Sequence, residues 1–175
     1  MTRGTWIVGA AALAFAAGCN KAPAPLTDAE RAAIADSVSQ MAMQWIATLS
    51  TQATPENILS RYVSGNELVH AEYGMIYPTY DSLLKVVRAM YRPGTALRIT
   101  LDQKRLTVLD RDVVVLTALL NGTMKDSAGK EMPVHEAWMA VFHRTADGWK
   151  VAADNEATPP PAPAPAPAKP KRRSR

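Results

Sequence analysis

Residues 136–155 read EAWMAVFHRTADGWKVAADN, and this stretch decides the fold. Asp147-Gly148 is a dipeptide typical of tight hairpin turns. On either side of it lie two runs rich in apolar, β-branched and aromatic residues, which favour extended backbone. The stretch therefore predicts two adjacent strands, at residues 132–143 and 149–155.

Two further strands are expected before this hairpin. Residues 97–102 alternate between apolar and polar side chains, and the apolar positions then change parity at Leu106 and Val108. A one-residue slip would turn the strand inside out, so we expect a β-bulge near Gln103. Residues 113–120 are nearly all apolar, which predicts a strand covered on both faces.

Helical segments precede these strands. Thr27-Asp-Ala-Glu30 is a capping box, and apolar residues then recur three or four positions apart to about Leu49, which predicts an amphipathic helix. Thr54-Pro55 begins a second, short helix. A short hairpin at residues 67–77 leads to a third helix at residues 81–91. Antiparallel strands that follow helices predict an α+β fold with the helices on one face of the sheet.

This order of elements resembles the nuclear transport factor 2-like superfamily, which includes SnoaL-like and ketosteroid-isomerase-like proteins. The resemblance covers residues 26–157 and is most specific at Asp147-Gly-Trp-Lys-Val151, because the superfamily often ends with a strand of this kind. It implies a curved antiparallel sheet wrapped around the N-terminal helices, like a cone with a cavity. Many relatives bind small apolar molecules in that cavity, some are isomerases, cyclases or hydratases, and dimers through the sheet are frequent.

The residues expected to carry chemistry depart from this pattern. Many SnoaL-like relatives have a His-Asp-His-like stretch on the last strand, where this chain has Ala153-Asp154-Asn155. If the apolar side chains from Trp149 onward line the cavity, simple alternation turns Asp154 toward solvent. Asp154 is therefore a weak catalytic candidate. Glu72 is a second weak candidate, as another carboxyl group on a predicted strand.

Glu136 is the best candidate for an acid or base. It shares a strand face with Trp138 and Phe142, and a carboxyl group beside buried aromatic rings could transfer a proton. The alternative is that Glu136 is solvated at the open end of the strand or paired with an arginine. We expect the pocket to be lined by aromatic side chains, namely Tyr62, Tyr77, Tyr80, Trp138 and Phe142.

The sequence predicts no cofactor and no metal. The three histidines, His70, His135 and His143, lack the spacing of metal ligands, and no phosphate-binding loop or nucleophile motif is present. Three functions stay open. The first is a non-catalytic module that binds a small molecule or a protein, the second is an isomerase- or hydratase-type enzyme acting on a small apolar substrate, and the third is a spacer in which the tail acts.

The N-terminal segment predicts export. Arg3 precedes an apolar run at residues 6–17, which is shorter than the roughly 20 residues of a membrane span and typical of a signal peptide. Ala17-Gly18-Cys19 resembles the lipobox of bacterial lipoproteins, which implies cleavage before Cys19 and its acylation, with palmitate for example. The alternative is an ordinary signal peptide with an incidental cysteine. Asn20 favours the outer membrane over the inner one, with the domain in the cell envelope facing the periplasm.

The chain thus divides into a signal peptide at 1–18, a lipidated tether at 19–25, a domain at 26–157 and a Pro/Ala-rich tail at 158–175 that we expect to be disordered. The tail ends in a basic tip made of Lys169, Lys171, Arg172, Arg173 and Arg175. This tip suits binding to an anionic envelope polymer or lipid surface. The alternative is that it only keeps the chain in solution.

Most of the net positive charge belongs to the two ends of the chain. Without the basic tip and Arg3, 14 of the 20 Lys+Arg remain, against 16 Asp+Glu. The rest of the chain is therefore mildly acidic. It lacks the basic face that a nucleic-acid-binding domain needs, so we expect no nucleic-acid partner.

Overall fold

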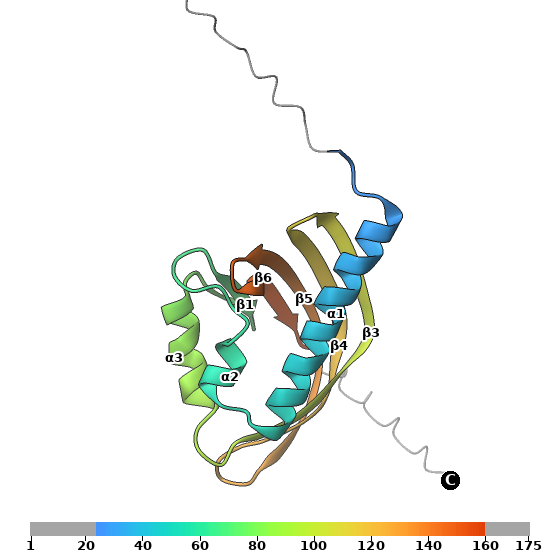
Figure 1. Ribbon diagram of the computed structural model, residues 1–175. Coiled ribbons are helices and arrows are strands. Elements are labelled where there is room, and N and C mark those ends of the chain that lie inside the picture. Colours follow the sequence, from blue (N-terminus) through green and yellow to red (C-terminus); the bar gives the residue numbers. More distant parts are fainter. Residues whose placement is uncertain (1–23, 160–175) are drawn as a thin grey trace, which may run out of the picture.

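The computed structural model describes residues 24–159. The predicted signal peptide, Cys19 and the basic tip at 169–175 lie outside the described residues. Among residues 24–159, none of the helices combines the length and apolar character needed to span a bilayer. In chain order (Figure 1) the elements are α1 (Asp28–Thr51), α2 (Pro55–Leu59), β1 (Val69–Glu72), β2 (Met75–Tyr77), α3 (Tyr80–Met90), β3 (Ala96–Asp110), β4 (Val113–Lys125), β5 (Glu131–Thr145) and β6 (Gly148–Ala157).

The helices begin at side-chain caps. The hydroxyl of Thr27 accepts a hydrogen bond from the backbone N–H of Glu30, whose carboxylate accepts one from the backbone N–H of Thr27, so the predicted capping box is confirmed. Thr54 caps α2, and Pro55 stands at its start as predicted. Such caps satisfy amide groups that have no partner within the helix.

The strands form one curved sheet in the order β2-β1-β6-β5-β4-β3. β3 to β6 are antiparallel neighbours, which confirms the predicted layer. β1 instead pairs with β6 in parallel, so the sheet is mixed. Two strands about eighty residues apart in the chain carry no local signal for their relative direction. This pairing places His70 directly opposite Asp154.

Two bulges set the faces of the long strands. The register of β3 on β4 shifts between Asp102 and Arg105, and Gln103 has a φ of 48°, which confirms the bulge predicted there. A second bulge lies in β6, where Val141 pairs with Ala153 while Phe142 pairs with Val151. The extra residue reverses the alternation of β6 beyond that point.

The second bulge corrects the prediction for Asp154. Trp149 and Val151 face the core as expected, but Asp154 also faces the interior, where it is only 6% exposed. Simple alternation fails because an Ala-Ala pair at 152–153 carries no apolar or polar signal that would show a change of parity.

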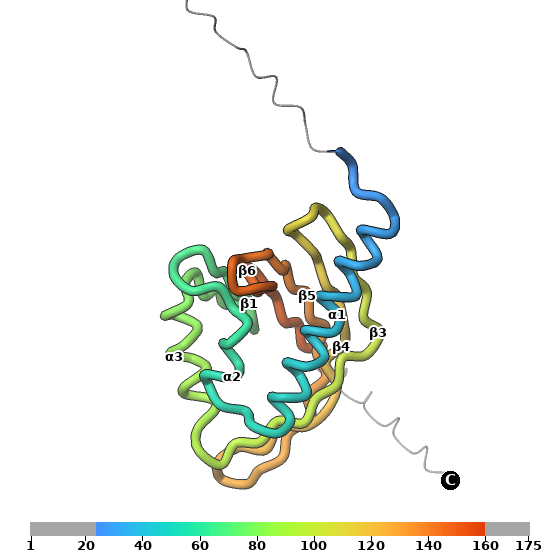
Figure 2. Tube along the Cα trace, in the orientation of Figure 1, coloured from blue at the N-terminus to red at the C-terminus, as the bar shows by residue number. Residues whose placement is uncertain are grey.

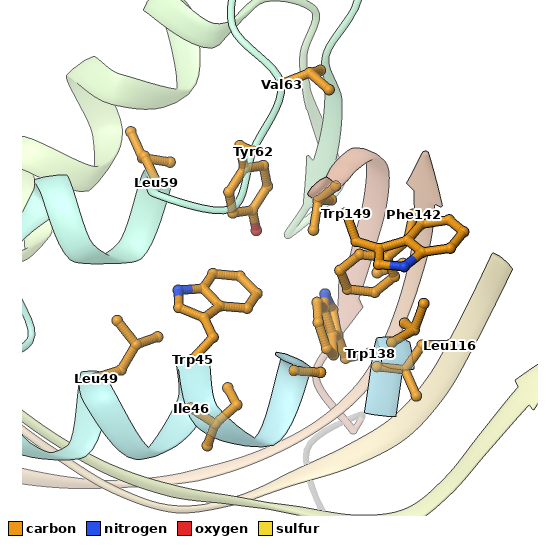
Figure 3. Close-up of a cluster of buried hydrophobic side chains, with 14 of the residues drawn as sticks. Trp45, Ile46, Leu49, Leu59, Tyr62, Val63, Leu116, Trp138, Phe142 and Trp149 are labelled. Atoms are coloured by element: carbon orange, nitrogen blue, oxygen red, sulfur yellow. The ribbon is translucent and has the colours of Figure 1, made fainter. Parts of the chain in front are cut away.

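The core lies between α1 and the concave face of the sheet. The ring of Trp45 meets the rings of Tyr62 and Trp138 at centroid distances of 5.8 and 6.1 Å, and Figure 3 shows Trp45 on α1 facing both. β4 buries one face, including Leu116, but Thr117 on its other face is exposed. The prediction that this strand is covered on both faces is wrong, because the helices of residues 24–159 all pack on one side.

The N-terminal half of α1 is fastened to the β3–β4 hairpin, beside which it runs (Figure 2). Arg31 donates a hydrogen bond to the carbonyl of Val108 at 2.9 Å, and Arg111 forms an ion pair with Glu30 at 3.2 Å. Because these contacts are exposed, each contributes little to stability. They fix where the chain enters the domain.

Candidate functional site

A cavity of about 210 Å³ lies beneath the concave face of the sheet. It is lined by residues from the C-terminal half of α1, from α2, from the end of α3, and from strands β1 and β3 to β6. Pockets that hold drug-sized molecules measure roughly 300–1,000 Å³, so this one suits a smaller ligand. Its wall is mainly aliphatic and aromatic, and Trp45, Tyr62, Tyr73, Tyr91 and Trp138 supply the rings.

The predicted pocket residues divide into two groups. Tyr62 and Trp138 line the cavity, whereas Tyr77, Tyr80 and Phe142 do not. Tyr77 stacks on His70 with ring centroids 5.7 Å apart, and Tyr80 packs against the outside of the core. Phe142 lies further along β5 than Trp138, in the fully packed part of the core. Sequence alternation identifies the inner face of a strand but not how far along it the cavity extends.

Asp154 is the centre of a buried hydrogen-bond network, and its side chain is 0% exposed. One carboxylate oxygen accepts from the hydroxyl of Tyr62 at 2.8 Å and from Nε1 of Trp138 at 3.2 Å. The other lies 2.8 Å from Nδ1 of His70. Figure 3 shows the hydroxyl of Tyr62 and the indole nitrogen of Trp138 pointing into the same space. Three donors therefore satisfy a carboxylate that would be costly to bury alone.

His70 supplies the positive charge of this network. Burial by itself would lower the pKa of His70, but its hydrogen bonds with Asp154 and Glu72 outweigh that effect and raise the pKa to about 10. Nε2 lies 3.6 Å from the Glu72 carboxylate. The imidazole is thus protonated at neutral pH, and both nitrogens face carboxylates. Burial, and then the charge of Asp154, raises the pKa of Tyr62 well above its usual value, so Tyr62 remains a neutral donor.

The role of His70 was not predicted, because the histidines were considered only as metal ligands. A signal was available, since His70 and Glu72 stand two residues apart on the hairpin predicted at 67–77 and so share a strand face. What the sequence did not show is the partner, because the parallel pairing of β1 with β6 brings Asp154 alongside.

Three glutamates from three adjacent strands line the cavity: Glu72 on β1, Glu156 on β6 and Glu136 on β5. Each has a carboxylate oxygen within 4.8 Å of the other two. Burial, followed by the charges of Glu72, Asp154 and Glu136, raises the pKa of Glu156 well above its usual value, although His70 opposes this. The raised pKa favours the protonated form of Glu156.

Glu136 is half-buried at the wall of the cavity. Its carboxylate accepts hydrogen bonds from the hydroxyl of Tyr73 at 3.2 Å and of Thr158 at 3.4 Å. No arginine pairs with it among residues 24–159. Glu136 thus faces the cavity with polar neighbours, at the wall rather than deep among the rings.

The arrangement can bind polar groups of a ligand more readily than it can stabilise a developing negative charge. Two of the donors that line the cavity, Tyr62 and Trp138, are engaged by Asp154. The three glutamates could also offer oxygen ligands to a metal. Prediction from histidine spacing missed this cluster, since it is made of carboxylates contributed by separate strands.

Comparison with known proteins gives a fold and no closer relation. No family model matches the chain, and no curated protein matches it significantly. Among solved structures, a nuclear transport factor 2-like protein of unknown function from Shewanella oneidensis superposes with a TM-score of 0.60 at 11% identity, over 70% of this chain and 98% of that chain. This chain has the nuclear transport factor 2-like fold. The resemblance predicted from the closing hairpin is confirmed at the level of the fold.

Other proteins with the nuclear transport factor 2-like fold differ widely in role. A scytalone dehydratase-like protein from Novosphingobium aromaticivorans superposes with a TM-score of 0.62 at 8% identity, over 74% of this chain and 87% of that chain. The association domain of C. elegans CaMKII superposes with a TM-score of 0.55 at 11% identity, over 75% of this chain and 100% of that chain. Since both enzymes and association domains share the fold, function must be argued from the site.

Proposed function

We propose that this protein is a lipid-anchored binding protein of the bacterial cell envelope, whose domain holds a small molecule in its cavity without transforming it. The cavity with its aromatic wall carries the proposal. The buried Asp154–His70 pair does not line this cavity, and both carboxylate oxygens of Asp154 already accept hydrogen bonds from side chains of the protein itself. A chemical role would require that pair to reach a substrate.

Binding can be tested through the two tryptophans of the wall. Because Trp45 and Trp138 line the cavity, a ligand that enters should change their fluorescence, and small molecules that copurify can be extracted and identified by mass spectrometry. Val134→Trp, which places a large ring at the wall, should abolish the change, whereas Val113→Trp outside the cavity should not. An empty protein that responds to no member of a broad library would defeat the proposal.

The anchor rests on residues 17–19, whose pattern resembles a lipobox. Several acyl chains would hold the domain firmly, since each buried CH₂ contributes about 0.8 kcal/mol. Mass spectrometry of the mature N-terminus should find a diacylglyceryl-modified Cys19, and Cys19→Ser should release the protein from membranes. An unmodified cysteine would refute the anchor.

An isomerase- or hydratase-type enzyme is the second candidate. The observation in its favour is that Glu136 lines the cavity beside Glu156, whose raised pKa favours its protonated form, so one carboxyl group could accept a proton while the other donates one. If turnover of a small apolar substrate is found, Glu136→Gln should lower kcat at least a hundredfold. Glu67→Gln, on an exposed residue outside the cavity, should leave it unchanged.

A homodimer through the convex face of the sheet is the partner that the fold favours. Met139 on β5 is 49% exposed, and its neighbours Val115, Leu119 and Val141 on that face are only partly covered. Such an apolar patch is typical of an interface. Sedimentation of Met139→Asp should give a monomer where the unmodified protein gives a dimer.

The basic tip of the tail is proposed to bind an anionic surface of the envelope. Deleting residues 160–175 should leave the unfolding temperature unchanged and weaken retention on vesicles that contain anionic lipid. Retention that survives the deletion at low salt would end this idea, because charge attraction is strongest there.

A further inference from the structure

The inner wall of the cavity can accommodate a positive charge as well as an apolar body. Trp45, Tyr62, Tyr91 and Trp138 contribute aromatic rings, and aromatic faces attract cations. Burial and the neighbouring glutamates raise the pKa of Tyr91, so its ring also stays uncharged. Aromatic side chains therefore suit either a neutral or a cationic apolar ligand. The charged residues of the wall determine which of the two is favoured.

The charges of the wall are all of one sign. Glu72, Glu136 and Glu156 line the cavity, while no lysine or arginine within residues 24–159 does so. The cation that faces these carboxylates is His70, whose Nδ1 lies 2.8 Å from Asp154 and whose Nε2 lies 3.6 Å from Glu72. Glu136 and Glu156 form no ion pair with a residue of the described chain.

We infer that the ligand of this cavity is an organic cation, whose ammonium group lies among Glu72, Glu136 and Glu156 and whose apolar body packs against the aromatic rings. The inference rests on the proposed binding function and names the class of molecule bound. The cavity provides the space and the apolar contacts for the body of the ligand. Independently, the negative glutamates favour a ligand with a positive charge. A carboxylate or phosphate ligand would be repelled by the same wall.

A bare metal ion fits the whole cavity less well. A metal ion would use only the carboxylates of the three glutamates, with water completing the six or more oxygen ligands that Ca²⁺ or Mg²⁺ takes. The rest of the wall offers mainly carbon to an ion, but to an amine it offers the surface that an apolar body needs. Metal binding is one of the outcomes of the test below.

Binding of a cation should release a proton. In the empty cavity Glu156 faces Glu72 from β1, Glu136 from β5, Asp154 from its own strand, and His70 as the opposing cation. An ammonium group beside Glu156 adds positive charge and favours its ionised form. Affinity for an amine should therefore increase as the pH rises toward the raised pKa of Glu156, whereas affinity for a neutral ligand should not.

Three probes of matched shape test the inference by calorimetry on the whole mature chain: 2-phenylethylammonium, 2-phenylethanol and phenylacetate. We expect the ammonium compound to bind about tenfold or more tightly than the alcohol, since a desolvated cation gains from both rings and carboxylates. Phenylacetate should not bind. Measurement in two buffers of different ionisation enthalpy should show proton release with the amine alone.

Variants identify the carboxylates responsible. Glu136→Gln and Glu156→Gln should each reduce the preference for the ammonium compound several-fold and leave binding of the alcohol unchanged, and the matched control Glu67→Gln should alter neither. Equal binding of amine and alcohol would overturn the inference and leave the proposed binding function standing. Failure of all three probes would count against both, and tight binding of Ca²⁺ alone that excludes the amine would replace the organic cation with a metal.

Discussion

Asp154 and Glu156 are carboxylates on the same face of β6, two residues apart, yet their surroundings are opposite. Asp154 is enclosed by the donors of Tyr62, His70 and Trp138. Glu156 faces the cavity between two other glutamates and accepts no side-chain hydrogen bond within residues 24–159. Asp154 is buried and satisfied by the protein's own donors, as buried polar groups nearly always are, whereas Glu156 is half-buried and presents its carboxyl group to the cavity, where a ligand could contact it.

The largest test of this contrast is removal of Asp154. Asp154→Ala leaves the hydroxyl of Tyr62, Nε1 of Trp138 and the imidazolium of His70 without their common acceptor. Loss of one partner from a buried charged pair costs about 3–5 kcal/mol. We expect a reduction of that size in the free energy of unfolding, measured by urea denaturation. A loss below about 1 kcal/mol would show that the network contributes little to the fold.

The pH dependence of stability tests how much His70 contributes to the same network. The folded-state pKa of about 10 lies above the ordinary value of 6.5, so the folded protein holds a proton that the unfolded chain has released. The stabilisation is fully present below pH 6.5 and is lost as the pH rises toward 10.

We expect the free energy of unfolding to fall by several kcal/mol, up to about 5 kcal/mol, across that window. In His70→Gln, which cannot titrate, the part of this slope that comes from His70 should be absent, although the protein is less stable at neutral pH. Equal slopes in both proteins would assign the pH dependence to other groups.

Glu156 should behave in the opposite sense to Asp154. Its folded-state pKa is raised, so stability is lost as the pH rises from the ordinary value of 4.5 toward that raised pKa, because the unfolded chain ionises first. Glu156→Gln removes this penalty and should stabilise the empty protein at pH 7 by about 1 kcal/mol. Glu67→Gln serves as the surface control, and a destabilised Glu156→Gln protein would place this residue among the structural carboxylates.

The contrast also shows what could be predicted from the sequence. Capping at Thr27 and the bulge at Gln103 are local features, and both were predicted, since a cap needs neighbouring residues and a change of apolar parity marks a bulge. The bulge near Ala152 left no such mark, which placed Asp154 on the wrong face. Residues of the site come from β1, β5 and β6, and their proximity depends on a parallel pairing that no local pattern reveals.

The smallest expected effect is at Tyr73, which links the turn after β1 to the glutamates. Its hydroxyl donates to Glu136 at 3.2 Å, but the residue is 63% exposed, so the hydrogen bond competes with water. Burial and the charges of Glu136 and Glu72 raise the pKa of Tyr73 to about 12, which keeps it a donor below that pH. Tyr73→Phe should change the free energy of unfolding by less than about 0.5 kcal/mol.

The same substitution frees one oxygen of Glu136 for a ligand. Affinity for 2-phenylethylammonium should then rise slightly, by about twofold, because the ammonium group no longer competes with the Tyr73 hydroxyl. Thr158 still donates to that oxygen at 3.4 Å, which limits the gain. A large loss of stability in Tyr73→Phe would mean that Glu136 depends on this bond as Asp154 depends on Tyr62, and that the glutamates belong to the fold rather than to a ligand.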